Sequence, residues 1–282
     1  MDRRGDRPAP RRSKASLRAL VRAAAIIGRS RNMQLRGAPR RVASRLLAGL
    51  DDALRRFGRR VTPVDEFSPL EPLLYRRLKR SGSRFFFIQV GANDGTLADP
   101  IYGFVTRNRV SGVVVEPLAD VFARLEAAYR AFPGVRPVNC AIHASKRSVT
   151  LHRVAPQFED SLPDWVRGIA SVNPDHHKLG GVPSSAITTE EASCLTLTEL
   201  LDRFAVRELD LLQIDTEGYD AEIIHSIDFG RIKPKIVRFE HGLSSGIMTP
   251  PVLEACVRRL AGEGYYVVME PYDVTCYLPY EI

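Results

Sequence analysis

The chain has 282 residues, of which 44% are hydrophobic, 26% charged and 8% aromatic. This composition excludes a collagen, a low-complexity chain and a bundle of membrane helices, and the length suits one large domain or two small ones. The formal charge of +8 is uneven: residues 1–60 contain 18 Lys and Arg against 4 Asp and Glu, whereas residues 61–282 contain 23 against 29. The body is therefore mildly acidic, and no nucleic-acid partner is expected.

Residues 1–60 are predicted to form a basic arm outside the folded domain. The first 15 residues lack the apolar side chains that would offset the cost of ordering them, so disorder is expected there. From Ser16 to Leu50, apolar residues recur with helical spacing among arginines. Three interpretations stay open: a solvated leader, a helix lying on an anionic membrane surface, and a twin-arginine export signal, which Arg18 and Arg22 disfavour.

Residues 61–282 are predicted to form a single α/β domain. Short apolar runs alternate with helical stretches, which is typical of a mostly parallel sheet with helices on both faces. The expected strands are 84–90, 112–116, 135–138, 209–215, 235–240, 265–269 and 274–278. The expected helices are 71–80, 99–108, 119–131, 196–204, 219–226 and 251–262.

An insert at about 153–192 interrupts this pattern. It is polar, contains Gly180-Gly181, and is longer than an ordinary connection, as functional or disordered loops are. We expect it to close over an acceptor, with His176 and His177 as surface residues. Trp165, the only tryptophan, also lies in this insert.

The cysteines indicate the compartment rather than the chemistry. No CxxC pair is present, so a zinc ribbon or a thioredoxin-type site is not expected. Scattered cysteines in a chain of this size favour reduced core residues and a cytoplasmic protein. The four are Cys140, Cys194, Cys256 and Cys276.

A glycine turn and a strand-end acid predict a nucleoside site. The turn from Gly91 to Gly95 follows the first expected strand, where small residues let the backbone approach a ligand. Glu116 ends the next strand, where a carboxylate can accept both hydroxyls of a ribose. The spacing is not GxGxxG, which argues against a dinucleotide.

A second acidic edge follows the strand 209–215. Asp215 and Glu217 lie at the ligand-bearing edge of the expected sheet, where they can bind an amine, bind a metal or act as a base. The alternative is a helix N-terminus, with Asp215 or Thr216 as its cap. No metal is assigned. Glu240-His241 ends the next strand at the same edge, either as a proton acceptor or as a structural histidine.

These residues resemble the FkbM family of S-adenosylmethionine-dependent methyltransferases. The matching segments are 87–95, 115–117, 194–201 and 211–218, and the likeness covers about residues 80–282. The resemblance implies a Rossmann-like class I methyltransferase fold with seven mostly parallel strands, and S-adenosylmethionine as cofactor. It also implies methyl transfer to a hydroxyl oxygen of a sugar, glycolipid or secondary metabolite.

The resemblance also implies roles for individual residues. Glu116, followed by Pro117, would hold the ribose, Ala141 would neighbour the adenine, and Asp215 would lie near the methionine. The cofactor loop would comprise Gly91, Ala92, Asn93, Asp94 and Gly95. The chain departs from the family at Gln89, where members often have Asp, so electrostatic help for the cofactor's amine would be lost.

Methyl transfer to an alcohol needs positioning and a proton acceptor, because a hydroxyl is a poor nucleophile at neutral pH. The candidates for this base are His241, Glu217 and His143. The expected partner is a small-molecule or glycan acceptor. A second hypothesis is a catalytically silent nucleoside-binding or scaffold protein of the same fold. The presence of Gly91, Gly95, Glu116, Asp215 and Glu217 together argues against this hypothesis.

Overall fold

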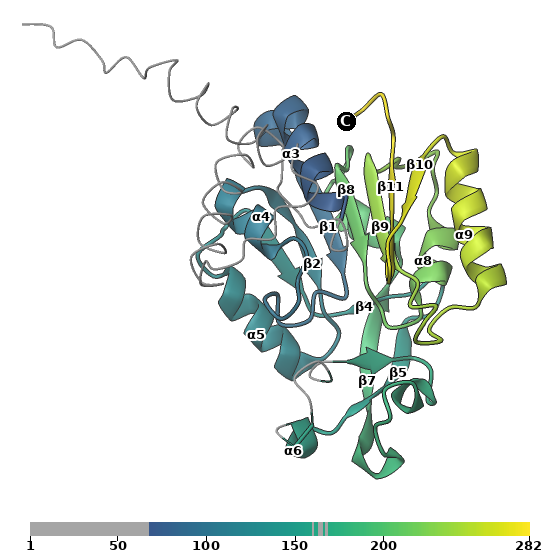
Figure 1. Ribbon diagram of the computed structural model, residues 1–282. Coiled ribbons are helices and arrows are strands. Elements are labelled where there is room, and N and C mark those ends of the chain that lie inside the picture. The colour runs from purple at the N-terminus through teal and green to yellow at the C-terminus, as the bar shows by residue number, and fades with distance from the viewer. Residues whose placement is uncertain (1–67, 160, 163–165, 167–168) are drawn as a thin grey trace, which may run out of the picture. The chain divides into compact units, whose positions relative to one another are not determined.

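The structure is a computed structural model that describes residues 68–282 apart from 160, 163–165 and 167–168 (Figure 1). The basic arm predicted at 1–60, with its three interpretations, lies outside the described residues, as does Trp165. Within the described part of the chain, no helix combines the length and apolar character needed to cross a membrane.

The main sheet has seven strands in the order β10-β11-β9-β8-β1-β2-β3. Only β11 runs antiparallel to its neighbours, and the other described pairings are parallel. This confirms the predicted Rossmann-like sheet and every predicted strand. The strands are β1 Phe86–Val90, β2 Ser111–Val115, β3 Val135–Val138, β8 Leu211–Ile214, β9 Ile236–Glu240, β10 Tyr266–Met269 and β11 Asp273–Tyr277.

Helices cover both faces of this sheet because its strands are apolar on both sides. Along β1, Phe87 belongs to the core under one layer of helices and Ile88 to the core under the other, and both are fully buried. One layer contains α3 Leu70–Ser81, α4 Tyr102–Asn108 and α5 Ala119–Tyr129. The other contains α7 Leu197–Arg203, α8 Asp220–Ser226 and α9 Pro250–Gly262.

The four cysteines are free and buried, as the sequence predicts. Three of them, Cys140, Cys256 and Cys276, belong to the core between the sheet and α7, α8 and α9. They therefore act as small apolar side chains in the folded domain.

A second sheet, which the sequence analysis missed, includes both ends of the predicted insert and extends beyond them. Its order is β4-β7-β5-β6, and β5 pairs antiparallel with β7 from Ser148↔Ser193 to Val154↔Ile187. Both long strands alternate buried and exposed residues, so they lack the continuous apolar runs of the main sheet. The strands are β4 Ala141–Ile142, β5 Ser148–Val154, β6 Ala170–Ser171 and β7 Ile187–Leu195. Between them lie the short helices α6 Pro156–Glu159, η4 His176–Lys178 and η5 Ser184–Ala186.

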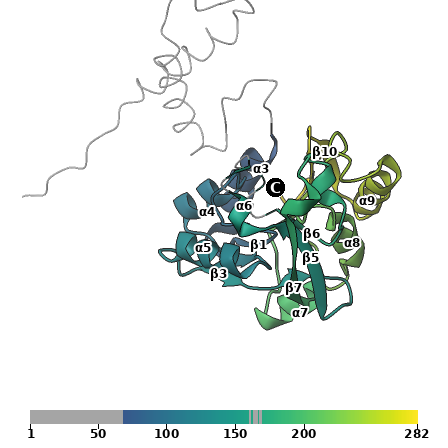
Figure 2. The same ribbon diagram turned by 90° about the horizontal axis from the view of Figure 1, so that it is seen from below.

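Polar contacts hold the second sheet at one end of the main sheet (Figures 1 and 2). The buried Arg153 of β5 donates to Asp120 at the start of α5, and also to Glu159 and Glu190. The guanidinium is thus paired with three carboxylates, which offsets the cost of burying its charge. The second sheet therefore has a fixed place near the carboxyl ends of the parallel strands.

Candidate active site

A cavity of about 520 Å³ lies between the carboxyl ends of the main-sheet strands and the second sheet. Its volume is in the range of small-molecule and cofactor sites. Residues of β1 and β2, together with the turns that follow β1, β2 and β8, line one side, and Val149, Leu151 and Ala170 line the other. Such a crevice outside the strand ends is where open α/β sheets bind ligands.

The glycine turn after β1 is held by the neighbouring strand ends. The amides of Gly91 and Ala92 both donate to the carbonyl of Val115, at 3.0 and 2.9 Å. Gly91 has φ +77°, and a Cβ there would lie 1.7 Å from the carbonyl oxygen of Asp215, so only glycine fits. Gly95 has φ +78° and packs against Leu125 of α5, so it shapes the turn without lining the cavity.

Glu116 is the buried acid at the end of β2. Its Oε2 accepts the amide of Asn93 and its Oε1 accepts the amide of Leu118, both at 3.0 Å. Burial raises the pKa of the carboxyl to about 7, although the two backbone amides favour its charged form. The carboxylate lines the cavity in a fixed orientation, and each oxygen keeps a lone pair that a hydroxyl can reach.

Apolar side chains line the cavity next to Glu116. Pro117 comes from the turn after β2, Ala141 and Ile142 form β4, and Val149 and Leu151 come from β5. A planar aromatic base is suited to such a surface. The sequence predicted Pro117 and Ala141 here, whereas the two β5 residues were missed together with their sheet.

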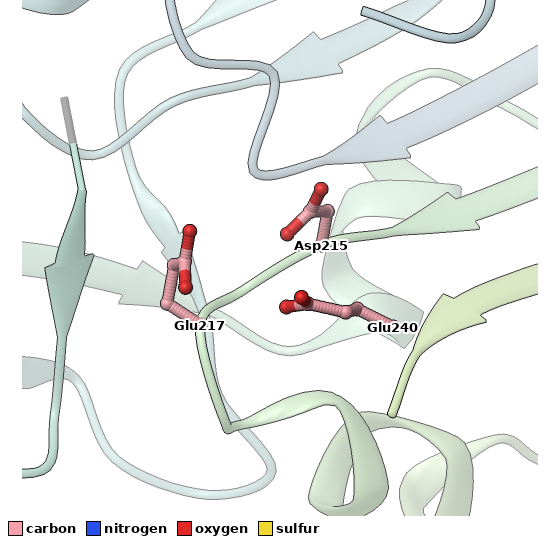
Figure 3. A group of neighbouring side chains, drawn as sticks. All are labelled: Asp215, Glu217 and Glu240. Carbon is pink, nitrogen blue, oxygen red and sulfur yellow. The ribbon is translucent and has the colours of Figure 1, made fainter. Parts of the chain in front are cut away.

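Three carboxylates lie close together, and two of them, Asp215 and Glu217, line the cavity (Figure 3). Asp215 and Glu217 follow β8, Glu240 ends β9, and their oxygens lie within 4.8 Å of one another. Burial and the neighbouring carboxylates raise the pKa of Asp215 well above its ordinary value, and the same causes raise the pKa of Glu240 to about 8. The group meets the spacing for a divalent cation, and it can also hold protons at neutral pH.

The helix-cap alternative for this edge is wrong. Helix α8 begins at Asp220, and Thr216 donates to the Asp220 carboxylate through its amide and its hydroxyl. Glu217 has φ +53°, in the left-handed region that non-glycine residues rarely adopt. The segment after β8 is thus a strained loop that lines the cavity, as strained segments at functional sites do.

Glu217 is also held by the second sheet. The Nε2 of His176 lies 3.0 Å from Oε2 of Glu217, and the hydroxyl of Ser171 donates to the Glu217 carbonyl at 2.7 Å. His176 is buried, so its prediction as a surface residue is wrong. His177 is half-buried and bonds Pro174 and Ser184. No sequence pattern links His176 to Glu217, which lies 41 residues away.

The two other predicted bases have different surroundings. His143 lines the cavity and stacks on Tyr219, but its Nδ1 accepts the amides of Ser145 and Lys146, so Nε2 carries the hydrogen of the neutral ring. Burial lowers its pKa, and the ring is a donor to any ligand. His241 does not line the cavity, and its ring bonds the Leu243 amide and the Glu270 carbonyl.

The structure brings together most of the predicted cofactor residues. Seven of them line the cavity: Gly91, Ala92, Asn93, Glu116, Pro117, Ala141 and Asp215. Asp94 and Gly95 do not, and Asp94 instead accepts the amides of Thr96 and Leu97 within the turn. The cavity-lining residues Gln89 and Asp99 were not predicted as site residues.

The sequence profile of the methyltransferase FkbM domain matches residues 89–260. No match was found among curated proteins.

Three solved structures illustrate the structural similarity. Precorrin-6y C5,15-methyltransferase from Geobacter metallireducens GS-15 is 14% identical, with 77% of this chain and 94% of that chain covered and a TM-score of 0.34. The METTL16 MTase domain is 12% identical, with 93% and 91% covered and a TM-score of 0.39. The SAH-bound Podospora anserina methyltransferase PaMTH1 is 13% identical, with 97% and 99% covered and a TM-score of 0.35.

Proposed function

Since this chain belongs to the FkbM methyltransferase family, with S-adenosylmethionine as cofactor and a Rossmann-like class I fold, we propose that it methylates a hydroxyl oxygen. The acceptor is a small molecule or glycan such as a sugar, glycolipid or secondary metabolite. One observation carries the proposal: a single cavity connects the buried Glu116 carboxylate with the carboxylate of Glu217. The residues proposed to bind the cofactor and the proposed proton acceptor therefore line the same cavity.

The residues present fit the cofactor. Glu116 is oriented by two backbone amides and has acceptor capacity for the two ribose hydroxyls, and Pro117, Ala141 and Ile142 offer an apolar surface to the adenine. At Gly91 the turn lies too close to the backbone of Asp215 for any side chain, and Gly91 also lines the cavity. When bound, S-adenosylmethionine supplies an electrophilic methyl group.

Glu217 is the base that the geometry favours among the three candidates. It lines the cavity, whereas His241 does not, and the ring of His143 has no free lone pair. Asp215 and Glu240 stand beside Glu217, so a proton taken up by this group relieves repulsion between like charges. A positioned base contributes about 10²–10⁴-fold to such a reaction.

The charge around Glu217 also restricts the acceptor. The described residues lining the cavity include three carboxylates besides Glu116 and no lysine or arginine. An anionic acceptor would be repelled, whereas a neutral polyhydroxy compound can donate to these oxygens. A hydroxyl on a neutral sugar or secondary metabolite is therefore the preferred acceptor class.

The experiment first measures binding and then turnover. Calorimetry is expected to show that the full chain binds S-adenosylhomocysteine, with affinity lowered about 10- to 100-fold by Glu116→Ala. Methyl-tritiated S-adenosylmethionine with sugar and lipid extracts then identifies the acceptor. Binding without label transfer to any extract would favour the silent nucleoside-binding protein, and no binding would refute the cofactor assignment.

We place the protein in the cytoplasm because its four cysteines are unpaired. The basic arm at 1–60 is proposed to be dispensable for catalysis and to contact an anionic membrane surface. Flotation of the full chain with anionic vesicles at low salt tests that contact, and absence of flotation leaves the solvated leader.

A further inference from the structure

Gln89 presents a buried hydrogen-bond acceptor without a partner. The residue lies on β1, is 3% exposed and lines the cavity. Its Nε2 donates to Oδ2 of Asp99 at 3.0 Å, while its Oε1 is buried and accepts no hydrogen bond from the described residues. A buried acceptor left unpaired destabilises the fold unless a ligand supplies the donor.

Asp99, which accepts this hydrogen bond, also lines the cavity and is held in place by backbone amides. Its Oδ1 accepts the amides of Ile101 and Tyr102 at the start of α4, both at 2.7 Å. Asp99 forms no ion pair with any residue that the structure describes, and no lysine or arginine is among the described residues that line the cavity. The carboxylate therefore lies beside the ligand space without a counter-charge from the protein.

We infer that Gln89 and Asp99 together bind the α-ammonium group of the cofactor's methionine. Asp99, which accepts the first amides before and in α4, supplies the negative charge that Gln89 on β1 lacks. This inference rests on the proposed cofactor.

The chemistry and the place of the pair agree with that ligand. An ammonium group offers three donors and no acceptor, which suits one free amide oxygen and one carboxylate. Gln89 pairs with Val114 on β2, two residues before Glu116, so the pair lies one strand away from the ribose carboxylate. A nucleoside held by Glu116 therefore has its amino-acid portion within reach of β1.

Asp99→Asn tests the charge while it preserves the shape, because the Oδ1 of asparagine can accept the same two amides of Ile101 and Tyr102. Two ligands are compared by calorimetry on the full chain: S-adenosylhomocysteine, and 5′-methylthioadenosine, which lacks the amino-acid portion. The dissociation constant of S-adenosylhomocysteine is expected to rise about 10- to 100-fold, as for loss of a charged hydrogen bond. That of 5′-methylthioadenosine should stay within about twofold. Glu126→Gln, an exposed charge on α5, is the matched control for net charge and should change neither.

The double variant Gln89→Glu/Asp99→Asn reverses the pair. A carboxylate on β1 would then accept from an amide at position 99, with the same net charge, and S-adenosylhomocysteine affinity should return to within a few-fold of wild type. Equal loss of both ligands in Asp99→Asn, or unchanged binding of both, overturns the inference. The inference is also overturned if Asp215→Asn selectively weakens the binding of S-adenosylhomocysteine and Asp99→Asn does not. That result would assign the ammonium group to the acidic group that contains Asp215. A wild-type chain that binds neither ligand refutes the cofactor assignment itself.

Discussion

The Nε2 of His176 lies 3.0 Å from Oε2 of Glu217, so a residue of the second sheet's loops holds a carboxylate that lines the cavity. The contact joins segments that are 41 residues apart in the chain. Because the Ser171 hydroxyl also donates to the Glu217 carbonyl, the strained loop after β8 is fixed by two contacts from the insert. The predicted insert thus positions a catalytic candidate in addition to covering the site.

Removing the His176 imidazole should lower turnover without weakening cofactor binding. In His176→Ala, Glu217 loses the donor that orients it, and we expect kcat to fall about 10-fold or more. The KM for S-adenosylmethionine and the affinity for S-adenosylhomocysteine should stay within about twofold. His176→Gln, which retains a donor, should recover part of kcat.

His177→Ala is the matched control for this variant, since the neighbouring ring bonds Pro174 and Ser184 rather than Glu217. Its kcat should equal that of wild type. If His176 has a purely structural role, His176→Ala should instead lower cofactor affinity and thermal stability together with kcat. His176→Gln would then restore all three quantities or none of them.

Glu217→Gln should remove the proton acceptor while preserving the size of the side chain. With the acceptor found in the extract screen, we expect methyl transfer to fall about 10²–10⁴-fold, with S-adenosylhomocysteine affinity nearly unchanged. Single-turnover measurement with tritiated cofactor separates the chemical step from product release. His241→Gln is the comparison variant. If the folded His241→Gln protein transfers methyl groups more slowly than Glu217→Gln does, the base has been assigned to the wrong residue.

The parts of the fold that the sequence predicted are those with a simple hydrophobic pattern. Strand β2 is a continuous run of buried valines, and such runs mark strands that are covered on both faces. Strands β5 and β7 are covered on one face only, so their threonines, glutamates and serines have the composition of a loop. The sequence analysis therefore interpreted this segment as a polar insert and did not recognise its strands.

The site was predictable only where function and local motif coincide. Glu116 and Asp215 line the cavity; Glu116 was predicted because it ends the strand that follows a glycine turn, and Asp215 because it ends an apolar strand at the same edge. Asp99 accepts backbone amides just before α4, as many polar residues in turns do, and only the contact with Gln89 distinguishes it. His241 appeared suitable because it follows a strand end, yet local backbone groups engage both of its ring nitrogens.

The pKa of Glu116 predicts a pH-dependent affinity for the nucleoside. Burial raises this pKa to about 7, and only the carboxylate accepts two ribose hydroxyls. Affinity for 5′-methylthioadenosine should therefore rise about 10-fold between pH 6 and pH 8, as the ionised fraction grows from about a tenth to nine-tenths. This ligand has no ammonium group, so Asp99 does not contribute to the change.

Glu116→Gln is the control for that titration. The variant should bind 5′-methylthioadenosine more weakly at pH 8 and show no rise between pH 6 and pH 8. A pH dependence that persists in the variant would have to come from another group, and Glu116 would then be removed from the ribose site.

The acidic group at Asp215, Glu217 and Glu240 predicts how stability changes with pH. Burial and like charges raise the pKa of Glu240 from 4.5 to about 8, so the folded state retains a proton that the unfolded state has lost. The stabilisation from this proton is complete below pH 4.5 and decreases as the pH rises towards 8. The melting temperature of the ligand-free protein should therefore fall between pH 5 and pH 8.

Glu240→Gln tests this prediction because an amide keeps the shape and cannot ionise. At pH 8 the variant should be more stable than wild type by about 1–2 kcal/mol, and at pH 5 the two should be nearly equal. Glu254→Gln, an exposed carboxylate on α9, should leave the pH dependence unchanged. Thermal and urea unfolding at both pH values provide the measurement. If Glu240→Gln destabilises the protein equally at pH 5 and pH 8, then Glu240 is ionised and paired in the folded state.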